Sequence, residues 1–279
     1  MVNGHLPASK DEALALLARG AGPVVAGGTD LLVKRRRWPG VAPAIPASAV
    51  YVANLSELHG VRTAGDFVAI GAATPLAALA AHPLVPDLLK AAIRETASPG
   101  IRTQATLAGN LANASPAADP ALVLVCLDAL IRLESAAGVR EVPANGFATG
   151  PGKTVLRPDE LITAILVPSD AGLRTAFVKV GGRKADAIAK VSFAGAVRVV
   201  DGTIASFRAA FGAVGPTAVR IPALEERIAG LSVEDLKARL PEFLAACGAA
   251  IRPIDDQRST AHYRRTVALH LLADFIGRL

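Results

Sequence analysis

Small residues, amide side chains and one acid are concentrated in the stretch that runs from Thr106 to Asp119. The stretch begins Thr-Leu-Ala-Gly-Asn, and a long apolar run follows it directly. Small residues let a backbone approach a ligand closely, and successive backbone N–H groups can surround an anion. We expect Thr106, Asn110 and Asn113 to donate hydrogen bonds, and Asp119 to accept them from ligand hydroxyl groups. The stretch shows almost no periodicity, so it is predicted to be a loop.

A second segment of the same character lies far upstream and reads Ala-Gly-Gly-Thr-Asp-Leu over residues 26–31. Residues 23–26 are predicted to form a short buried strand, the two glycines a turn, and residues 30–34 the start of a helix. This order presents free N–H groups to an anion. Asp30 would repel a phosphate, so we expect its side chain to point away and cap backbone N–H groups. Either segment alone is typical of an ordinary glycine turn; the pair indicates a ligand with two phosphates and two ends.

Other signatures of catalysis are missing from the sequence. Residues 150–154 resemble the end of a P-loop, but Phe147 occupies the position of its first glycine, which favours a surface turn. The five histidines have no metal-ligand spacing, and no nucleophile or general base stands out. Cys126 and Cys247 are far apart and are expected to be buried apolar residues. The sequence therefore predicts no catalytic residue and no metal site, so reactive atoms would belong to a cofactor.

The composition predicts a folded protein with a substantial core. The chain has 279 residues, 52% hydrophobic and 19% charged, and no apolar run is long enough to span a membrane. Charged residues 10–12 stand where a signal peptide would need apolar ones, so we expect a cytoplasmic protein. The net charge of +6 includes the basic run at residues 34–38. Aromatic residues make up only 4%, which argues against nucleic acid and favours a solvated helix end or a protein-docking face.

The first 168 residues alternate between helical and strand patterns. Ser9 and Glu12 form a capping box that predicts a helix ending near Gly20, and Thr74 is expected to cap a helix that begins at Pro75. Strands are predicted at 50–52, 67–70 and 161–167, a hairpin at 129–133 and 139–142, and helices at 75–81, 86–95 and 120–128.

The pattern changes near residue 170. Strands are predicted at 174–180, 191–200 and 203–214, and Asp201-Gly202 is a strong hairpin signal. Helices are then predicted at 222–230, 233–240, 241–250 and from about 259 onward. In the last helix the spacing of Tyr263, Val267 and Leu271 indicates a core-facing stripe. Strands followed by helices predict an α+β fold with a domain boundary near residue 170.

Together the two glycine motifs resemble those of the FAD-binding medium subunit of the molybdenum hydroxylases. This family includes carbon monoxide dehydrogenase, xanthine dehydrogenase and related aldehyde and N-heterocycle dehydrogenases. Its first motif matches residues 26–31, and its second, usually T-x-G-G-N followed by an acid, matches residues 106–110 with Asp119. The resemblance extends along nearly the whole chain, through residues 70–74, 101–102, 158–162, 186–192 and 258–265.

The resemblance implies a two-lobed PCMH-type FAD-binding domain over residues 1–170, with lobes at about 1–55 and 56–168. A C-terminal domain over 171–279 would hold a three-stranded antiparallel sheet plus helices. FAD would lie extended between the lobes, with its diphosphate at both glycine motifs and an adenosine-side hydroxyl at Asp119. The implied FAD contacts are Val25, Ala26, Gly27, Gly28, Thr29, Asp30, Leu31, Thr106, Leu107, Ala108, Gly109, Asn110, Asp119, Ile162 and Lys179.

Two positions depart from the family pattern. Ala108 replaces the first glycine of the usual pair, and Thr103 stands where asparagine is common. The extra methyl group of Ala108 fits where the backbone φ is negative and would press on the diphosphate where φ is positive. Two distant cysteines also cannot supply the inserted four-cysteine iron–sulfur site of the benzoyl-CoA-type branch.

By this resemblance the chain is an electron-transfer subunit of an oxidoreductase. Electrons would pass from the 2Fe-2S clusters of a small partner subunit through FAD to NAD, a quinone or oxygen. Substrate oxidation would occur on a large molybdopterin-binding subunit. The alternatives are a stand-alone flavoenzyme of the related FAD fold, similar to a sugar-nucleotide reductase, and a flavin-free assembly subunit.

Overall fold

The N-terminal part of the chain packs one helix against a small parallel sheet. The computed structural model describes residues 4–169 and 172–279. Helix α1 (Lys10–Ala18) begins after Ser9, whose Oγ accepts from the Glu12 backbone N–H at 3.1 Å. The Glu12 carboxylate accepts from the Ala8 N–H at 2.7 Å, so the predicted helix start is confirmed. Strands β1 (Val24–Val25) and β2 (Val50–Tyr51) pair in parallel, and helices α2 (Leu31–Lys34) and η1 (Ser56–Leu58) complete this part.

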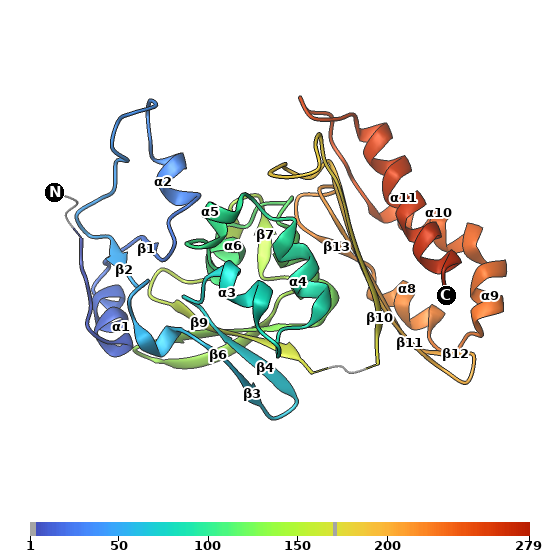
Figure 1. Cartoon of the computed structure of the whole chain (residues 1–279), viewed down its shortest axis with the longest axis horizontal. Coiled ribbons are helices and arrows are strands. Elements are labelled where there is room, and N and C mark those ends of the chain that lie inside the picture. Colours follow the sequence, from blue (N-terminus) through green and yellow to red (C-terminus); the bar gives the residue numbers. More distant parts are fainter. Residues whose placement is uncertain (1–3, 170–171) are drawn as a thin grey trace.

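Five antiparallel strands form the next sheet, in the order β3-β4-β9-β5-β6. Its strands are β3 (Val61–Ala64), β4 (Phe67–Gly71), β5 (Leu130–Ser135), β6 (Gly138–Pro143) and β9 (Leu161–Pro168). One face carries α3 (Leu76–Ala81), α4 (Asp87–Arg94), α5 (Pro99–Arg102) and α6 (Leu107–Asn113), as Figure 1 shows. Helix α7 (Asp119–Cys126) packs against α4 and α6. The sequence missed β3, because three of its four side chains are exposed and leave no apolar pattern.

The predicted surface turn at 150–154 is confirmed. It joins two short strands, β7 (Ala148–Gly150) and β8 (Lys153–Thr154).

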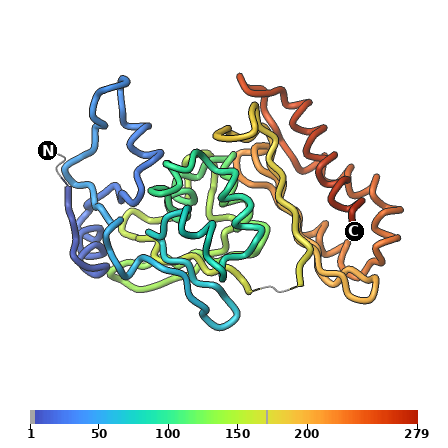
Figure 2. Tube along the Cα trace, in the orientation of Figure 1, coloured from blue at the N-terminus to red at the C-terminus, as the bar shows by residue number. Residues whose placement is uncertain are grey.

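A second antiparallel sheet forms the C-terminal domain. Strands β10 (Arg174–Val180), β11 (Val191–Val200) and β12 (Thr203–Gly212) agree closely with the prediction, and the two-residue β13 (Val219–Arg220) extends the sheet. Asp201 and Gly202 both have positive φ, as a tight hairpin turn requires. Helices α8 (Pro222–Ile228), α9 (Val233–Ala238), α10 (Leu240–Ala250) and α11 (Ala261–Gly277) cover its outer face, as the trace in Figure 2 shows.

Helix α7 joins the two sheets into one molecule. All but one of its residues are buried, and it packs on β11 and β12 as well as on α4. The Cys126 thiol donates to the Ala194 carbonyl of β11 at 3.4 Å. Both cysteines are buried free thiols, as predicted, and burial raises the pKa of each to about 12.

Three local predictions were wrong. The stretch from Thr106 is not a loop, because its first half forms α6. Thr74 does not cap α3; its Oγ1 accepts from the Gly60 N–H at 3.0 Å, and the helix begins one residue later than predicted. In α11 the fully buried positions lie one residue along from the predicted stripe, so Tyr263 is 42% exposed while Arg264 is buried.

The domain boundary predicted near residue 170 coincides with residues 170–171, outside the described residues, and stays a prediction. Within the described ranges, every helix falls short of the length and apolarity that a bilayer crossing requires.

The position of α7 generates a stability prediction. Leu122 is 1% exposed and faces Gly212 of β12. Leu122→Ala should lower the free energy of unfolding by about 2–5 kcal/mol, because it leaves a cavity between the two sheets. Urea denaturation measures the change. Leu84→Ala is the control, since Leu84 is 42% exposed and its truncation should cost less than about 0.5 kcal/mol. Equal losses in the two variants would contradict the placement of α7.

Candidate functional site

The first glycine motif lies between β1 and α2. Gly28 has a φ of +67°, which an L-residue adopts only under strain, and its carbonyl accepts from the Leu32 N–H at 2.9 Å. Asp30 was expected to cap backbone N–H groups, and this prediction was wrong. Its carboxylate instead pairs with Lys34 Nζ at 2.7 Å, one helical turn away. The motif therefore combines a turn that requires glycine with a short helix, and the Asp30 carboxylate lies along the surface of that helix.

The second motif is the first turn of α6. Thr106 is the N-cap residue, and its Oγ1 accepts from the Gly109 N–H at 3.0 Å. Asn110 Oδ1 accepts from the Ala121 N–H at 3.2 Å and so fixes α6 against α7. Asn113 Oδ1 accepts from Lys34 Nζ of the first motif's helix. The side chains expected to donate to a ligand thus also hold the motif in place.

The two motifs touch through their backbones. A Cβ atom at Gly27 would overlap the carbonyl group of Gln104 and would lie 3.0 Å from the Ala105 Cα. Residues 104 and 105 lead directly into the Thr106 cap. Only glycine permits this approach, so two segments that are distant in sequence lie side by side; their contact with one diphosphate stays a prediction.

Ala108 does not obstruct this junction. It lies inside α6, is 6% exposed and belongs to the main apolar core. Among the described residues, the non-glycine positions with positive φ do not include Ala108. The methyl group therefore packs inward, where it fits, and the substitution gives no support to a flavin-free chain.

Gly109, unlike the buried Ala108, lies on the exposed face of α6. Its backbone is exposed on α6, and an added Cβ would come close only to the Thr106 Oγ1, at 3.0 Å. The interior of a helix disfavours glycine by about 1 kcal/mol relative to alanine. The fold alone gives little reason for glycine here, whereas close approach of a ligand does.

Asp119 lies at the first position of α7 and binds the C-terminal domain. Its Oδ2 pairs with Lys179 Nζ at 2.6 Å, and both side chains are about 95% buried, at 5% and 6% relative exposure. Lys179 Nζ also donates to the Glu95 carbonyl at 2.7 Å. Burial raises the pKa of the Asp119 carboxyl to about 6, although the Lys179 ammonium lowers it. The other oxygen, Oδ1, is buried and forms no hydrogen bond, and the buried Ser192 hydroxyl, which also has none, is close enough to lower the Asp119 pKa.

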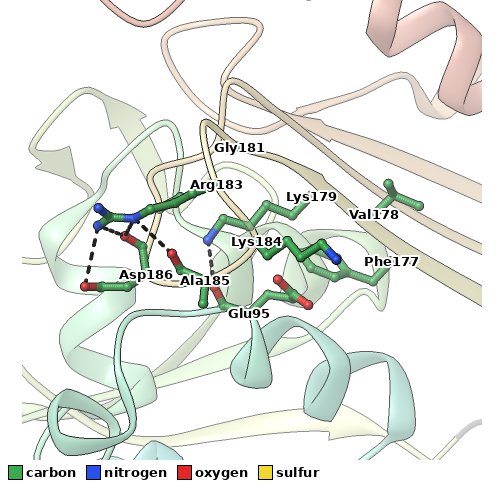
Figure 3. Close-up of a pocket in the computed structure, with 10 residues that line it drawn as sticks. Glu95, Phe177, Val178, Lys179, Gly181, Arg183, Lys184, Ala185 and Asp186 are labelled. Atoms are coloured by element: carbon green, nitrogen blue, oxygen red, sulfur yellow. Dashed lines mark hydrogen bonds and ion pairs between the residues drawn. The ribbon is translucent and has the colours of Figure 1, made fainter.

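Lys179 also lines a cavity of about 410 Å³ between the two domains. Figure 3 shows Lys179 pointing to the Glu95 carbonyl, with the loop after β10 closing the other side. In that loop Arg183 donates to the carbonyls of Ala185 and Asp186, each at 3.0 Å from Nε. The volume is in the range of small-molecule sites. Lys179 was predicted from the sequence as a site residue, whereas the other cavity residues Glu95, Arg183 and Lys184 were not. Arg183 and Lys184 stand just before the family match at 186–192, which was their only signal, and Glu95 at the end of α4 carried none.

The other residues predicted to contact FAD lie outside the cavity. Val25 is buried, and Leu107 lies in the main core with Ile162. Ile162 does not line the cavity, so its contact with a ligand stays a prediction. Among residues 4–169 and 172–279, no cluster of histidine, cysteine, aspartate or glutamate could hold a metal ion.

Comparison with known proteins covers both domains. Residues 1–170 match the FAD binding domain in molybdopterin dehydrogenase, and residues 176–279 match the CO dehydrogenase flavoprotein C-terminal domain. The putative xanthine dehydrogenase FAD-binding subunit of Escherichia coli is 35% identical over 96% of this chain and 91% of that protein. The carbon monoxide dehydrogenase medium chain of Hydrogenophaga pseudoflava is 32% identical over 95% and 92%.

The fold also matches solved structures. In a structure of carbon monoxide dehydrogenase from Hydrogenophaga pseudoflava, one chain superposes with a TM-score of 0.86 at 30% identity, covering 98% of this chain and 94% of that chain. A reconstituted CO dehydrogenase from Oligotropha carboxidovorans gives a TM-score of 0.88 at 27% identity, with coverages of 98% and 96%.

Asp119 generates a pH prediction. Between pH 3.8 and about 6 the folded protein holds a proton on Asp119 that the unfolded chain has lost, so this group's contribution to stability falls as the pH rises. The stability of the wild type minus that of Asp119→Asn should therefore fall by about 2 kcal/mol between about pH 4 and about pH 7. Urea denaturation at both pH values measures this difference.

Glu134→Gln is the matched control for this experiment. Burial alone would raise the pKa of Glu134, but hydrogen bonds from Lys10 and Thr163 hold it below its ordinary value. Its contribution to stability is therefore lost as the pH falls, which is the opposite sign. If both variants show the same pH dependence, the assignment of Asp119 is wrong.

Proposed function

The chain belongs to the FAD-binding family of the molybdopterin dehydrogenases, and on that premise we propose that it carries electrons within a molybdenum-containing hydroxylase complex. FAD is its cofactor, and its relatives are subunits of xanthine and carbon monoxide dehydrogenases. In this proposal a small subunit supplies electrons from 2Fe-2S clusters, and a large molybdopterin-binding subunit oxidises the substrate. The flavin then passes the electrons to NAD, a quinone or oxygen.

The contact between the two glycine motifs supports the FAD site most strongly. Gly27 lies so close to the backbone of residues 104–105 that no other residue type would fit. Gly109, in the first turn of α6, has an exposed backbone and no side chain to keep a ligand away. We assign the diphosphate of FAD to this junction, with Gly27, Gly28, Thr29 and the backbone of residues 106–110 around it. Asp119 Oδ1 forms no hydrogen bond within the chain, so it can accept from a hydroxyl group of the cofactor, with the nearby Ser192 hydroxyl as the competing donor.

The cavity beside Lys179 completes the assignment. We place one end of the cofactor there, because the cavity lies between the domains and Lys179 is tied to Asp119. When bound, FAD supplies a carrier that accepts electrons singly and releases them in pairs. The chain's own residues bind and orient it. Lys179, held by Asp119 and the Glu95 carbonyl, keeps a positive charge at the cavity wall.

Electron transfer from an iron–sulfur partner tests this proposal directly. The 2Fe-2S subunit of the same complex, reduced with dithionite, is mixed anaerobically with the FAD-loaded chain. The visible flavin absorption should bleach as the clusters are reoxidised. NAD, a quinone and oxygen are then added to separate samples, and the flavin absorption should return in the sample that contains the physiological acceptor. If the clusters stay reduced beside oxidised flavin, the electron-transfer role is wrong.

Two helical glycines provide a matched test of the FAD site. Gly109→Ala places a methyl group where we expect the diphosphate and should weaken FAD binding at least about tenfold, or about 1.4 kcal/mol. Gly248→Ala, in α10, meets only ordinary contacts beyond 3.5 Å and should leave FAD affinity unchanged. Gly248→Ala should keep or slightly gain stability. In Gly109→Ala the Thr106 Oγ1, 3.0 Å from the new Cβ, has to shift, so urea denaturation without FAD checks that the fold is kept. Flavin fluorescence titration measures the affinities; equal affinities for the two variants would contradict the assignment.

A further inference from the structure

Residues 33–41 form an exposed segment that combines bulky apolar side chains with arginines; we call it the 33–41 segment. Val33, Trp38 and Val41 are 65%, 71% and 50% exposed, and Trp38 is the only tryptophan of the chain. Arg35, Arg36 and Arg37 lie between them in the sequence. Figure 1 shows the chain after α2 rising away from the rest of the molecule. A large exposed aromatic beside several arginines is typical of the residues that dominate protein interfaces.

The positive charge of this segment is largely uncompensated within the chain. Lys34 pairs with Asp30 at 2.7 Å, so its charge is offset locally. For Arg35, Arg36 and Arg37, the described part of the chain provides no ion pair to any of the three side chains. Three guanidinium groups therefore remain available, and each can bind a carboxylate through two parallel hydrogen bonds.

Backbone hydrogen bonds give the segment a defined shape. The Ala44 N–H donates to the Arg35 carbonyl at 2.9 Å and closes the loop at its base. Within the loop, the Val41 N–H donates to the Trp38 carbonyl at 3.2 Å. The arginines and Trp38 are thus presented on a closed loop, which reduces the entropy lost when they bind a partner.

The segment borders the candidate FAD site. Helix α2 starts three residues after Gly28, and Lys34 Nζ donates to Asn113 Oδ1 at the end of α6. A protein seated on the 33–41 segment would therefore lie next to both glycine motifs. In a complex that moves electrons into FAD, the donor subunit has to dock on the chain close to the bound cofactor, and the 33–41 segment lies close to the proposed diphosphate site.

We propose that the 33–41 segment docks an acidic surface of the 2Fe-2S partner subunit. This inference rests on the proposed function and adds to it the location of the contact and its chemistry. Arg36 and Arg37 pair with carboxylates of the partner, and Trp38 with Val33 and Val41 supplies the apolar part of the contact. Aromatic residues make up only 4% of the chain and do not recur along the basic run, which disfavours nucleic acid as the occupant.

Charge reversal tests the docking surface. The FAD-loaded chain is titrated with the separately purified 2Fe-2S subunit at rising NaCl concentration. Arg36→Glu/Arg37→Glu should weaken binding about tenfold or more at low salt, with the difference shrinking as salt screens the charges. Trp38→Ala should weaken binding at least about tenfold at every salt concentration. Arg62→Glu/Lys153→Glu is the matched control and should bind as the wild type does, because both residues are exposed elsewhere.

Three other outcomes have distinct meanings. Wild-type affinity in both 33–41 variants, with the FAD content unchanged, overturns the docking proposal and leaves the proposed function intact. Failure of the wild-type chain to bind the 2Fe-2S subunit at all overturns the proposed function itself. The wild type could instead bind anionic phospholipid vesicles or duplex DNA more tightly than the 2Fe-2S subunit, while the variants do not. In that case the anionic surface is the occupant of the segment, and the docking proposal is overturned.

Discussion

The candidate site depends on one steric constraint, the backbone contact between Gly27 and the residues that precede the Thr106 cap. A side chain at Gly27 would overlap the Gln104 carbonyl group, so the first lobe could not approach the second. This contact places the left-handed turn at Gly28 beside the first turn of α6. Glycine's freedom in the unfolded chain makes such a contact costly in entropy. Its presence at the meeting point of two polar motifs is consistent with a role in ligand binding.

A second constraint links the site to the C-terminal domain. Helix α7 lies between the two sheets, and the Asp119–Lys179 pair joins its first turn to β10. Burying two charges is costly, and the raised pKa of Asp119 reflects that cost. A buried pair of this kind is weak evidence for stability alone. The pair holds Lys179 at the cavity wall, and a hydrophobic pair of the same volume could not supply a positive charge to the cofactor end that we propose there.

Much of the fold could be predicted from the sequence, because the strands of the C-terminal domain are long and apolar and the Asp201-Gly202 turn is distinctive. The two motifs were also recognised in advance. The sequence could not show that Thr106 starts a helix, because seven residues with a glycine and two asparagines carry no helical period. Nor could it show that Asp30 prefers Lys34 to the backbone, or that the Ala108 methyl points into the core. These outcomes depend on tertiary contacts.

The central claim is that the two glycine motifs together hold FAD, and the flavin released from the purified protein tests it most directly. The chain should purify with a visible flavin spectrum and release FAD, rather than FMN, on heat denaturation, in close to equimolar amount. FMN lacks the second phosphate and the adenosine, so it should not replace FAD in the stripped protein. A colourless chain that binds neither flavin when FAD is added back would contradict the account, and equal binding of FMN would remove the diphosphate from the junction.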